Sequence, residues 1–332
     1  MPGSLQPEML PGDPEPKPMT AIADEQGLTP EILPKSRRSI GRERRLRSLR
    51  ASWALFRTSW IGLAGLVVLC LFILIALAAP LLVPKSGTLE AVTVASGSPR
   101  LSPPVPGYPL GTDKFGRSIS TMLIWGAQVS LLVGALATVG TMVIGAAVGI
   151  SAGFFGGRID SLLMRLTDWF LVIPWLALAL VLASILGPTL LNIIVVISIT
   201  SWAFTARVVR AQALTVKSRP YVERAKALGG RNWHVITRHV LPNTFPIVFA
   251  QTILIAAAAI LTESTLAFLG LGDPQSVSWG KMLQEGFNQA AITTGRWWLI
   301  IPPGLCIVLL VLSLTMIGYA FDQILNPRLR DR

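Results

Sequence analysis

The polar chemistry of this chain is concentrated in residues 221–243, which read YVERAKALGGRNWHVITRHVLPN. The stretch carries four lysines and arginines and both histidines of a protein that is 52% hydrophobic. Histidines can bind metals or move protons, and clustered cations can bind nucleic acid or an acidic protein surface. Because long uncharged runs flank this insert, its structure and its partner are central to what the protein does.

Cap and turn signals divide the insert into two short helices. Ser218 can cap the first helix, and Gly229-Gly230 ends it. Asn232 can cap a second helix over 233–240, which Leu241-Pro242 closes. We therefore expect a rigid, charged pair of short helices with a left-handed glycine at position 229.

Metal and nucleotide chemistry are both disfavoured. His234 and His239 stand five residues apart without a cluster of other ligands, so packing or hydrogen bonding explains them better than a metal site. The phosphate-binding loop of ATPases requires Gly-Lys followed by Ser or Thr, whereas Gly280-Lys281 is followed by Met282. We expect no cofactor in this chain and no ATP hydrolysis by it.

Glu263 is the single charged residue between positions 240 and 272. A carboxylate in the middle of a membrane span costs roughly 3 kcal/mol on insertion scales, so it should face a partner group or a cavity. Two roles stay open: a structural pairing inside the protein, or a contact with the transport pathway or another subunit.

The elements that position these residues are membrane spans. The mean hydropathy is +0.60 and 14% of residues are charged, against about 25% in soluble domains. A bilayer core about 30 Å thick needs roughly 20 apolar residues in helix. The uncharged runs predict an all-α polytopic membrane protein with six transmembrane helices: Trp60–Val83, Val129–Phe154, Trp169–Leu186, Leu190–Phe204, Pro246–Leu269 and Trp297–Phe321.

The basic residues predict which side of the membrane each loop faces. Twenty-three of the 29 lysines and arginines fall on the side of the two termini and six on the other, which places both termini in the cytoplasm. The loop 205–245 is then cytoplasmic and the Pro- and Gly-rich loop 85–127 lies outside. A loop of 41 residues tied to the membrane at both ends is poorly suited to a DNA groove, so we expect a protein partner and no nucleic acid.

Composition divides the rest of the chain. Residues 1–34 are Pro-rich and acidic, which predicts a disordered cytoplasmic tail. Residues 35–57 hold nine basic residues and helical apolar spacing, typical either of an amphipathic helix on the lipid bilayer surface or of a merely solvated basic segment. Residues 58–322 form the transmembrane permease domain, and 323–332 the cytoplasmic C-terminus.

The insert resembles the E-A-A-x3-G-x9-I-x-L-P signature of permease subunits in bacterial binding-protein-dependent ABC importers. The matching residues are Glu223, Ala225, Gly229, Leu241 and Pro242, while Arg224 and His239 depart from the pattern. Five further stretches resemble the second permease subunit of dipeptide, oligopeptide and nickel uptake systems: APLL (79–82), PLGTDKFGRSISTMLIWGAQVSLLVG (109–134), AGFFGGRID (152–160), LAFLGLGDP (266–274) and SWGKML (278–283). The likeness covers about residues 45–330.

This resemblance implies the type I ABC importer permease fold in a multi-pass protein of the bacterial cytoplasmic (inner) membrane. It also implies four partners: a homologous permease subunit, two cytoplasmic ATPase subunits that hold ATP and magnesium, and an extracytoplasmic substrate-binding protein. The five matching residues would couple the ATPase subunits to the spans. The alternatives are an ion-coupled secondary transporter and a membrane-embedded enzyme. The sequence leaves the substrate open among peptides, nickel chelates and similar small solutes.

Overall fold

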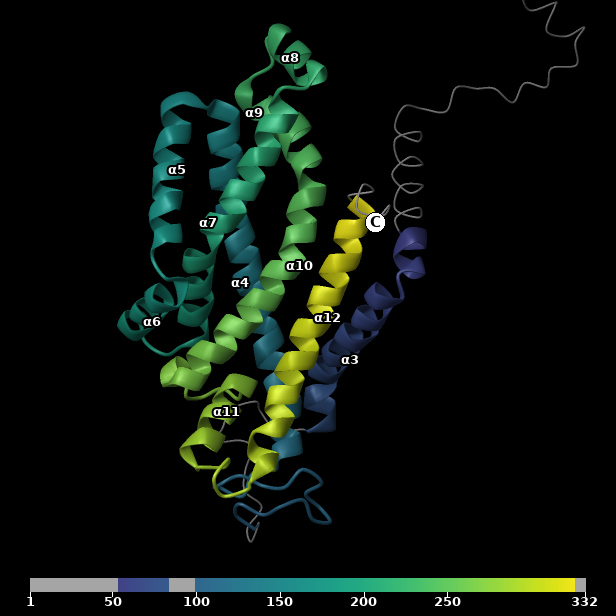
Figure 1. Cartoon of the computed structure of the whole chain (residues 1–332), viewed down its shortest axis with the longest axis vertical. Coiled ribbons are helices and arrows are strands. Elements are labelled where there is room, and N and C mark those ends of the chain that lie inside the picture. Colours follow the sequence, from purple (N-terminus) through teal and green to yellow (C-terminus); the bar gives the residue numbers. More distant parts are fainter. Residues whose placement is uncertain (1–52, 84–98, 326–332) are drawn as a thin grey trace, which may run out of the picture. The chain divides into compact units, whose positions relative to one another are not determined.

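The computed structural model describes residues 53–83 and 99–325. Within these residues the chain is a bundle of long helices (Figure 1). The helices are α3 (Trp60–Leu82), α4 (Ile119–Phe155), α5 (Gly157–Val172), α6 (Trp175–Leu186), α7 (Leu190–Lys217), α8 (Pro220–Ala227), α9 (Asn232–Val235), α10 (Leu241–Leu266), α11 (Trp279–Asn288) and α12 (Ile301–Leu325). Residues 236–240 and 267–271 form π-helical turns, and Trp297–Leu299 a short 3-10 helix.

The six predicted spans correspond to five continuous helical segments and one bent pair of helices. The expected membrane protein of helical class is therefore confirmed. The prediction for α4 was too short: the helix starts at Ile119, ten residues before the expected Val129. Residues 119–128 contain no proline and no charge, so the helix runs through them and includes residues 119–127 of the predicted outer loop 85–127.

The third predicted span, Trp169–Leu186, is wrong as a single helix. The structure breaks it into α5 and α6, whose axes differ by 90°. The cause is Pro174, which lacks a backbone N–H and disfavours helical geometry at the residue before it. Ile173 accordingly has an extended backbone (φ −71°, ψ 129°). The predicted break at Gly187-Pro188 is present, and α7 starts at Leu190.

Close packing of α4 on α7 forms the centre of the bundle. Gly145, Gly149 and Gly153 recur every fourth residue on α4 and lie directly against α7. A Cβ atom at Gly149 would lie 2.5 Å from the backbone oxygen of Ala206. Only glycine allows the two backbones to approach this closely, as is usual for small residues at helix contacts in membranes.

The bundle has two distinct ends (Figure 1). We call the one that carries α8 and α9 the α8 end, and the opposite one, which carries α11 and the segment 99–118, the α11 end. The predicted tail 1–34, most of the predicted basic segment 35–57 and residues 326–332 lie outside the described residues. Residues 53–58 are helical, and the Phe56 ring packs at a tilt against Phe321 of α12 with ring centroids 5.2 Å apart.

Candidate functional site

The start of α8 differs from the prediction in its cap. Ser218 ends α7 instead of capping α8, and its hydroxyl donates to the Thr215 carbonyl at 3.1 Å. Arg219 takes the cap position with an extended backbone, and no side chain caps the helix. Pro220 then opens α8, which suits proline because its fixed φ is already helical and its missing N–H would have no partner there.

The end of α8 is a Schellman turn built on two glycines. Gly229 has φ +81°, the left-handed geometry that the sequence predicts. Its N–H donates to the Lys226 carbonyl at 2.9 Å, and the Gly230 N–H donates to the Ala225 carbonyl at 3.0 Å. A Cβ on Gly230 would lie 2.6 Å from that same Ala225 oxygen, so this position needs glycine for space rather than for its dihedral angles.

The second predicted helix, 233–240, does not end where the sequence suggested. α9 spans only Asn232–Val235 with Arg231, not Asn232, at its cap, and a π turn over 236–240 continues directly into α10. Leu241-Pro242 therefore begins a helix instead of closing one. Proline is tolerated in the first turn of α10 because the wider π turn adjusts the hydrogen bonds that its missing N–H disrupts. The α8 turn is thus joined to α10 without a flexible linker.

Three buried valines fix this element to the bundle. Val222 of α8, Val235 of α9 and Val240 of the π turn are fully buried. They pack against the ends of α4 and α7, mainly Ile150, Phe154, Val209, Ala213 and Val216. Burial of a valine side chain contributes about 1.5–3 kcal/mol, so the three valines hold α8, α9 and the π turn against the ends of α4 and α7.

The opposite face of the element is exposed and mixed in character. Leu228 and Trp233 are 82% and 75% exposed, and Tyr221 is 40% exposed. Glu223 and Gly229 are also exposed, whereas Ala225 is half-buried against the bundle. Exposed aromatic and aliphatic side chains beside charges are the usual composition of a protein-docking surface.

The charged groups around α8 lie near an aromatic ring and near one another. The Lys226 ammonium lies 4.6 Å from the centre of the Phe154 ring. Burial lowers the pKa of Lys226 below its ordinary value; nearby Lys217 acts in the same direction and Glu223 opposes both. The rings of His234 and His239 are 6.2 Å apart, and among the described residues no group of three potential metal ligands occurs.

The predicted coupling residues gather at one end, and Glu263 does not join them. Leu241 and Pro242 lie in the first turn of α10 near α8, and both are exposed. Glu263 stands 22 residues further along α10, about 33 Å away at 1.5 Å per residue. Its side chain is 1% exposed and accepts long hydrogen bonds of 3.4 Å from the hydroxyls of Ser130 and Ser264.

Glu263 is therefore enclosed within this chain. Ser130 brings α4 to the carboxyl group, and the start of α11 lies against the neighbouring Ser264, whose backbone oxygen would be 2.5 Å from a Cβ atom on Gly280. In the part of the chain that the structure describes, no lysine or arginine forms an ion pair with it. Its role in a pathway or between subunits stays a prediction.

A second polar cluster, which sequence reasoning missed, lies at the α11 end. Arg117 is 5% exposed; its guanidinium donates to Asp113 at 2.5 Å and to Glu285 of α11 at 2.8 Å. Asp113 also accepts the backbone N–H groups of Phe115 and Arg117 at 2.9 and 2.8 Å. The Asp-x3-Arg spacing could have suggested the first pair, but Glu285 is 168 residues from Arg117.

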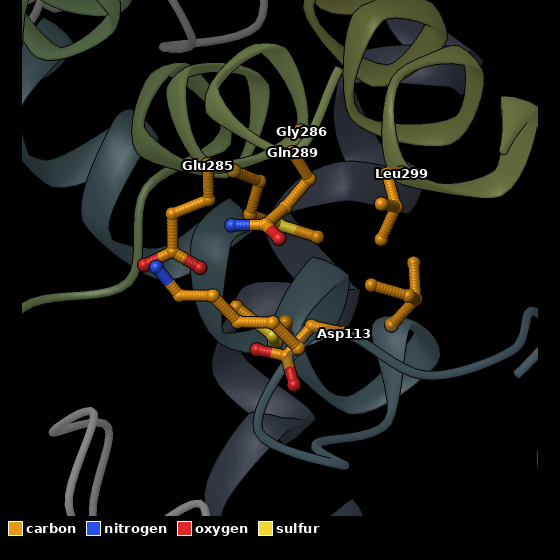
Figure 2. Close-up of a pocket in the computed structure, with 9 residues that line it drawn as sticks. Asp113, Glu285, Gly286, Gln289 and Leu299 are labelled. Atoms are coloured by element: carbon orange, nitrogen blue, oxygen red, sulfur yellow. The ribbon is translucent and has the colours of Figure 1, made fainter. Parts of the chain in front are cut away.

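Figure 2 shows the small pocket beside this cluster, with α11 on one side and the segment around Asp113 on the other. The lining residues are Asp113, Lys114, Ile119, Met122, Met282, Glu285, Gly286, Gln289 and Leu299. Nearby, Lys281 donates to the backbone oxygens of Asp273 and Pro274 at 3.2 and 2.6 Å, and burial lowers its pKa. The cluster fastens α11 to the segment 99–118.

Two family models match the chain. Residues 145–331 match the binding-protein-dependent transport system inner membrane component, which covers more than half of the chain. Residues 49–104 match the N-terminal transmembrane domain of oligopeptide transport permease C. The two matches include the whole of the α8 turn and α10, and they leave out residues 105–144, which hold the first part of α4.

Several curated relatives are similar over most of their length. The dipeptide transport system permease protein DppC of Bacillus subtilis is 34% identical over 280 residues, which is 84% of this chain and 85% of that protein. The oligopeptide transport system permease protein OppC of the same organism is 32% identical over 277 residues, covering 83% and 88%. The DppC of Haemophilus influenzae is 33% identical over 292 residues, covering 85% and 96%.

These similarities distinguish a permease subunit of an ABC importer from a secondary transporter. A secondary transporter, the alternative that the sequence left open, is wrong, because the family and the relatives are components of binding-protein-dependent systems. Membership of a permease family is consistent with a chain that is not itself an enzyme. The chain belongs to the family of binding-protein-dependent transport system inner membrane components and is a multi-pass permease subunit of an ABC importer.

Proposed function

We propose that this permease forms half of a translocation pathway for peptides. In the proposed complex it pairs with a homologous permease subunit, two cytoplasmic ATPase subunits drive it, and an extracytoplasmic substrate-binding protein loads it. Peptides are favoured as substrates because the similar proteins are named for dipeptide and oligopeptide transport. ATP and magnesium bind to the ATPase subunits, and this chain holds no cofactor.

The observation that carries the proposal is the α8 turn, which leads directly into the start of α10. Its buried face is fastened by valines and its exposed face offers Glu223, Leu228 and Trp233 to a partner. Because α9, the π turn and α10 are continuous from Asn232 to Leu266, we expect a push on α8 to displace this whole helical segment. This is the property needed to carry the closing motion of two ATPase subunits into the membrane.

The proposal places the α8 end and both termini in the cytoplasm. The distribution of basic residues supports this orientation, because eight lysines and arginines fall in 205–245 and the opposite side has six in all. The segment 99–118 and α11 then face outward, where a substrate-binding protein could reach them.

Reconstitution tests the proposal. The four kinds of subunit are co-expressed and placed in liposomes, and peptide uptake is measured with ATP inside. We expect uptake that requires every subunit, and no ATP hydrolysis by the lone permease. Peptide uptake by the lone chain, driven by an ion gradient without ATP, would contradict the proposal.

A further inference from the structure

We propose that Glu263 is a positioning residue that locks the start of α11 onto α10, so that displacement of the α8 end reaches the α11 end. This inference rests on the proposed function, since it names the residues by which motion from the ATPase subunits reaches the outer side. Four observations carry it: the continuity of α10, the packing of residues 278–280, the chemistry of the Glu263 pocket, and the attachment of α11 to the outer segment.

The tripeptide Ser278-Trp279-Gly280 anchors α11 in three different helices. Trp279 is fully buried; its ring packs edge-on against Phe72 of α3 at 5.4 Å, and its indole N–H donates to the Leu123 carbonyl of α4 at 3.0 Å. Burying a tryptophan in this way anchors the first turn of α11. Trp279 therefore lies between α3 and α4 and contacts both.

The third helix in the anchor is α10. A Cβ atom on Gly280 would lie 2.5 Å from the backbone oxygen of Ser264 and 2.9 Å from the side chain of Ala267. The backbones of α10 and α11 are thus in direct contact, with no side chain between them. Contacts this close leave little room for sliding, because protein interiors are packed to crystal-like density.

Glu263 completes the junction chemically. Ser278 caps α11: its hydroxyl oxygen accepts the backbone N–H of Lys281 at 3.3 Å. A hydroxyl has one donor in addition to its acceptor sites, so the cap leaves the Ser278 proton available to a neighbouring acceptor. The contact between Gly280 and the Ser264 backbone brings this cap to the part of α10 that carries Glu263. Ser130 and Ser264 donate to the Glu263 carboxyl group, which therefore joins α4 to α10 at the point where α11 begins.

The far end of α11 is attached as firmly. Glu285 accepts from the buried guanidinium of Arg117, which Asp113 holds in the segment 99–118. α11 is thus fastened to α10 at its first residues and to the outer segment seven residues after Ser278. A displacement of α10 can therefore pass through α11 to the segment 99–118 at the outer surface, by packed and hydrogen-bonded contacts.

A comparison of basal and stimulated ATP hydrolysis tests the role of Glu263. The assembled complex is measured with and without peptide-loaded substrate-binding protein. In Glu263→Leu and in Ser278→Ala we expect the stimulation to fall about tenfold, equivalent to about 1.4 kcal/mol. Basal hydrolysis and retention of the ATPase subunits should stay unchanged, which separates positioning from a general loss of structure.

Matched variants sharpen the experiment. Glu263→Gln and Ser278→Thr keep an acceptor and a hydroxyl, so stimulation should stay within about twofold of the wild type. Thr262→Val is the control, because the Thr262 hydroxyl donates only to the Ala258 carbonyl of its own helix. Wild-type stimulation in both Glu263→Leu and Ser278→Ala, a parallel loss of basal hydrolysis, or equal damage from Thr262→Val would overturn the proposal. If the wild-type complex shows no stimulation, the proposed function fails.

A distance measurement tests the role of the α11 start without any added peptide. Spin labels are placed at Phe287 of α11 and Leu81 of α3, which are 60% and 85% exposed, in a background with Cys70 and Cys306 replaced by alanine. We expect a non-hydrolysable ATP analogue to shift the distance distribution in the wild type and in Ser278→Thr, but not in Ser278→Ala. A shift that persists in Ser278→Ala, or no shift in the wild type, overturns the inference.

Discussion

Replacing Gly229 by valine should uncouple the ATPase subunits while leaving the bundle intact. Gly229 sits at φ +81°, and an added Cβ would meet no atom within 4 Å. The penalty is therefore purely conformational, about 1–2 kcal/mol for a side chain in the left-handed region. Relief of this strain would require the Schellman turn to open and α8 to change direction.

The size of this conformational strain sets the expected loss of ATPase binding and peptide uptake. One to two kcal/mol corresponds to about a 5- to 30-fold change in the population of the correctly turned α8. We expect ATPase subunits to co-purify less well and peptide uptake to fall by a similar factor, while membrane insertion is unchanged. Gly229→Asn should lose much less, because asparagine tolerates this geometry.

A matched control distinguishes local redirection from general strain. Gly187, between α6 and α7, also has a left-handed backbone (φ +86°) and open space around it. Gly187→Val also places a β-branched side chain at a positive φ, here with ψ 160° and far from α8 in the sequence. If Gly229→Val transports at the wild-type rate, or if Gly187→Val weakens ATPase binding equally, the reasoning about the α8 turn is refuted.

Three further predictions follow from the described contacts. Glu223→Ala should weaken ATPase binding by up to about fivefold, as expected for an exposed ion pair, and pull-down titration would show no change if Glu223 has no partner. Arg117→Met should lower the free energy of unfolding by about 3 kcal/mol, because it leaves the buried Asp113 and the part-buried Glu285 without their cation, and adding Glu285→Leu should restore part of that loss in thermal melts. Single cysteines at Leu228 and Phe115 should react with a membrane-impermeant thiol reagent from opposite sides; labelling from one side would refute the topology.

The hydrophobic pattern predicts the helices well because each span must be long, uncharged and apolar. It fails where one residue redirects a helix. Pro174 gives no sign of its 90° bend in a hydropathy profile, since the residues on both sides are apolar. Leu241-Pro242 looks like a stop signal, yet the π turn before it allows the helix to continue.

Some features of the candidate site could be predicted from the sequence, and others could not. The left-handed Gly229 could be predicted because the geometry of a helix end is local. The need for glycine at Gly230 and Gly280 could not, because it comes from backbone atoms brought close by the fold. Ser130 and Glu263 are 133 positions apart, and Arg117 and Glu285 are 168 positions apart, so no local pattern connects either pair.

The length of α4 has a consequence for the lipid environment. Its 37 residues extend about 55 Å, whereas a bilayer with its headgroups is about 40–45 Å thick. The α8 turn packs on Phe154 near the end of this helix, so it is supported by rigid helix and not by a loop. Thinning or thickening of the bilayer by a few ångströms then changes the tilt of the bundle and leaves the spacing between α4, α7 and α8 intact. The transporter should keep its coupling in membranes of different acyl-chain length.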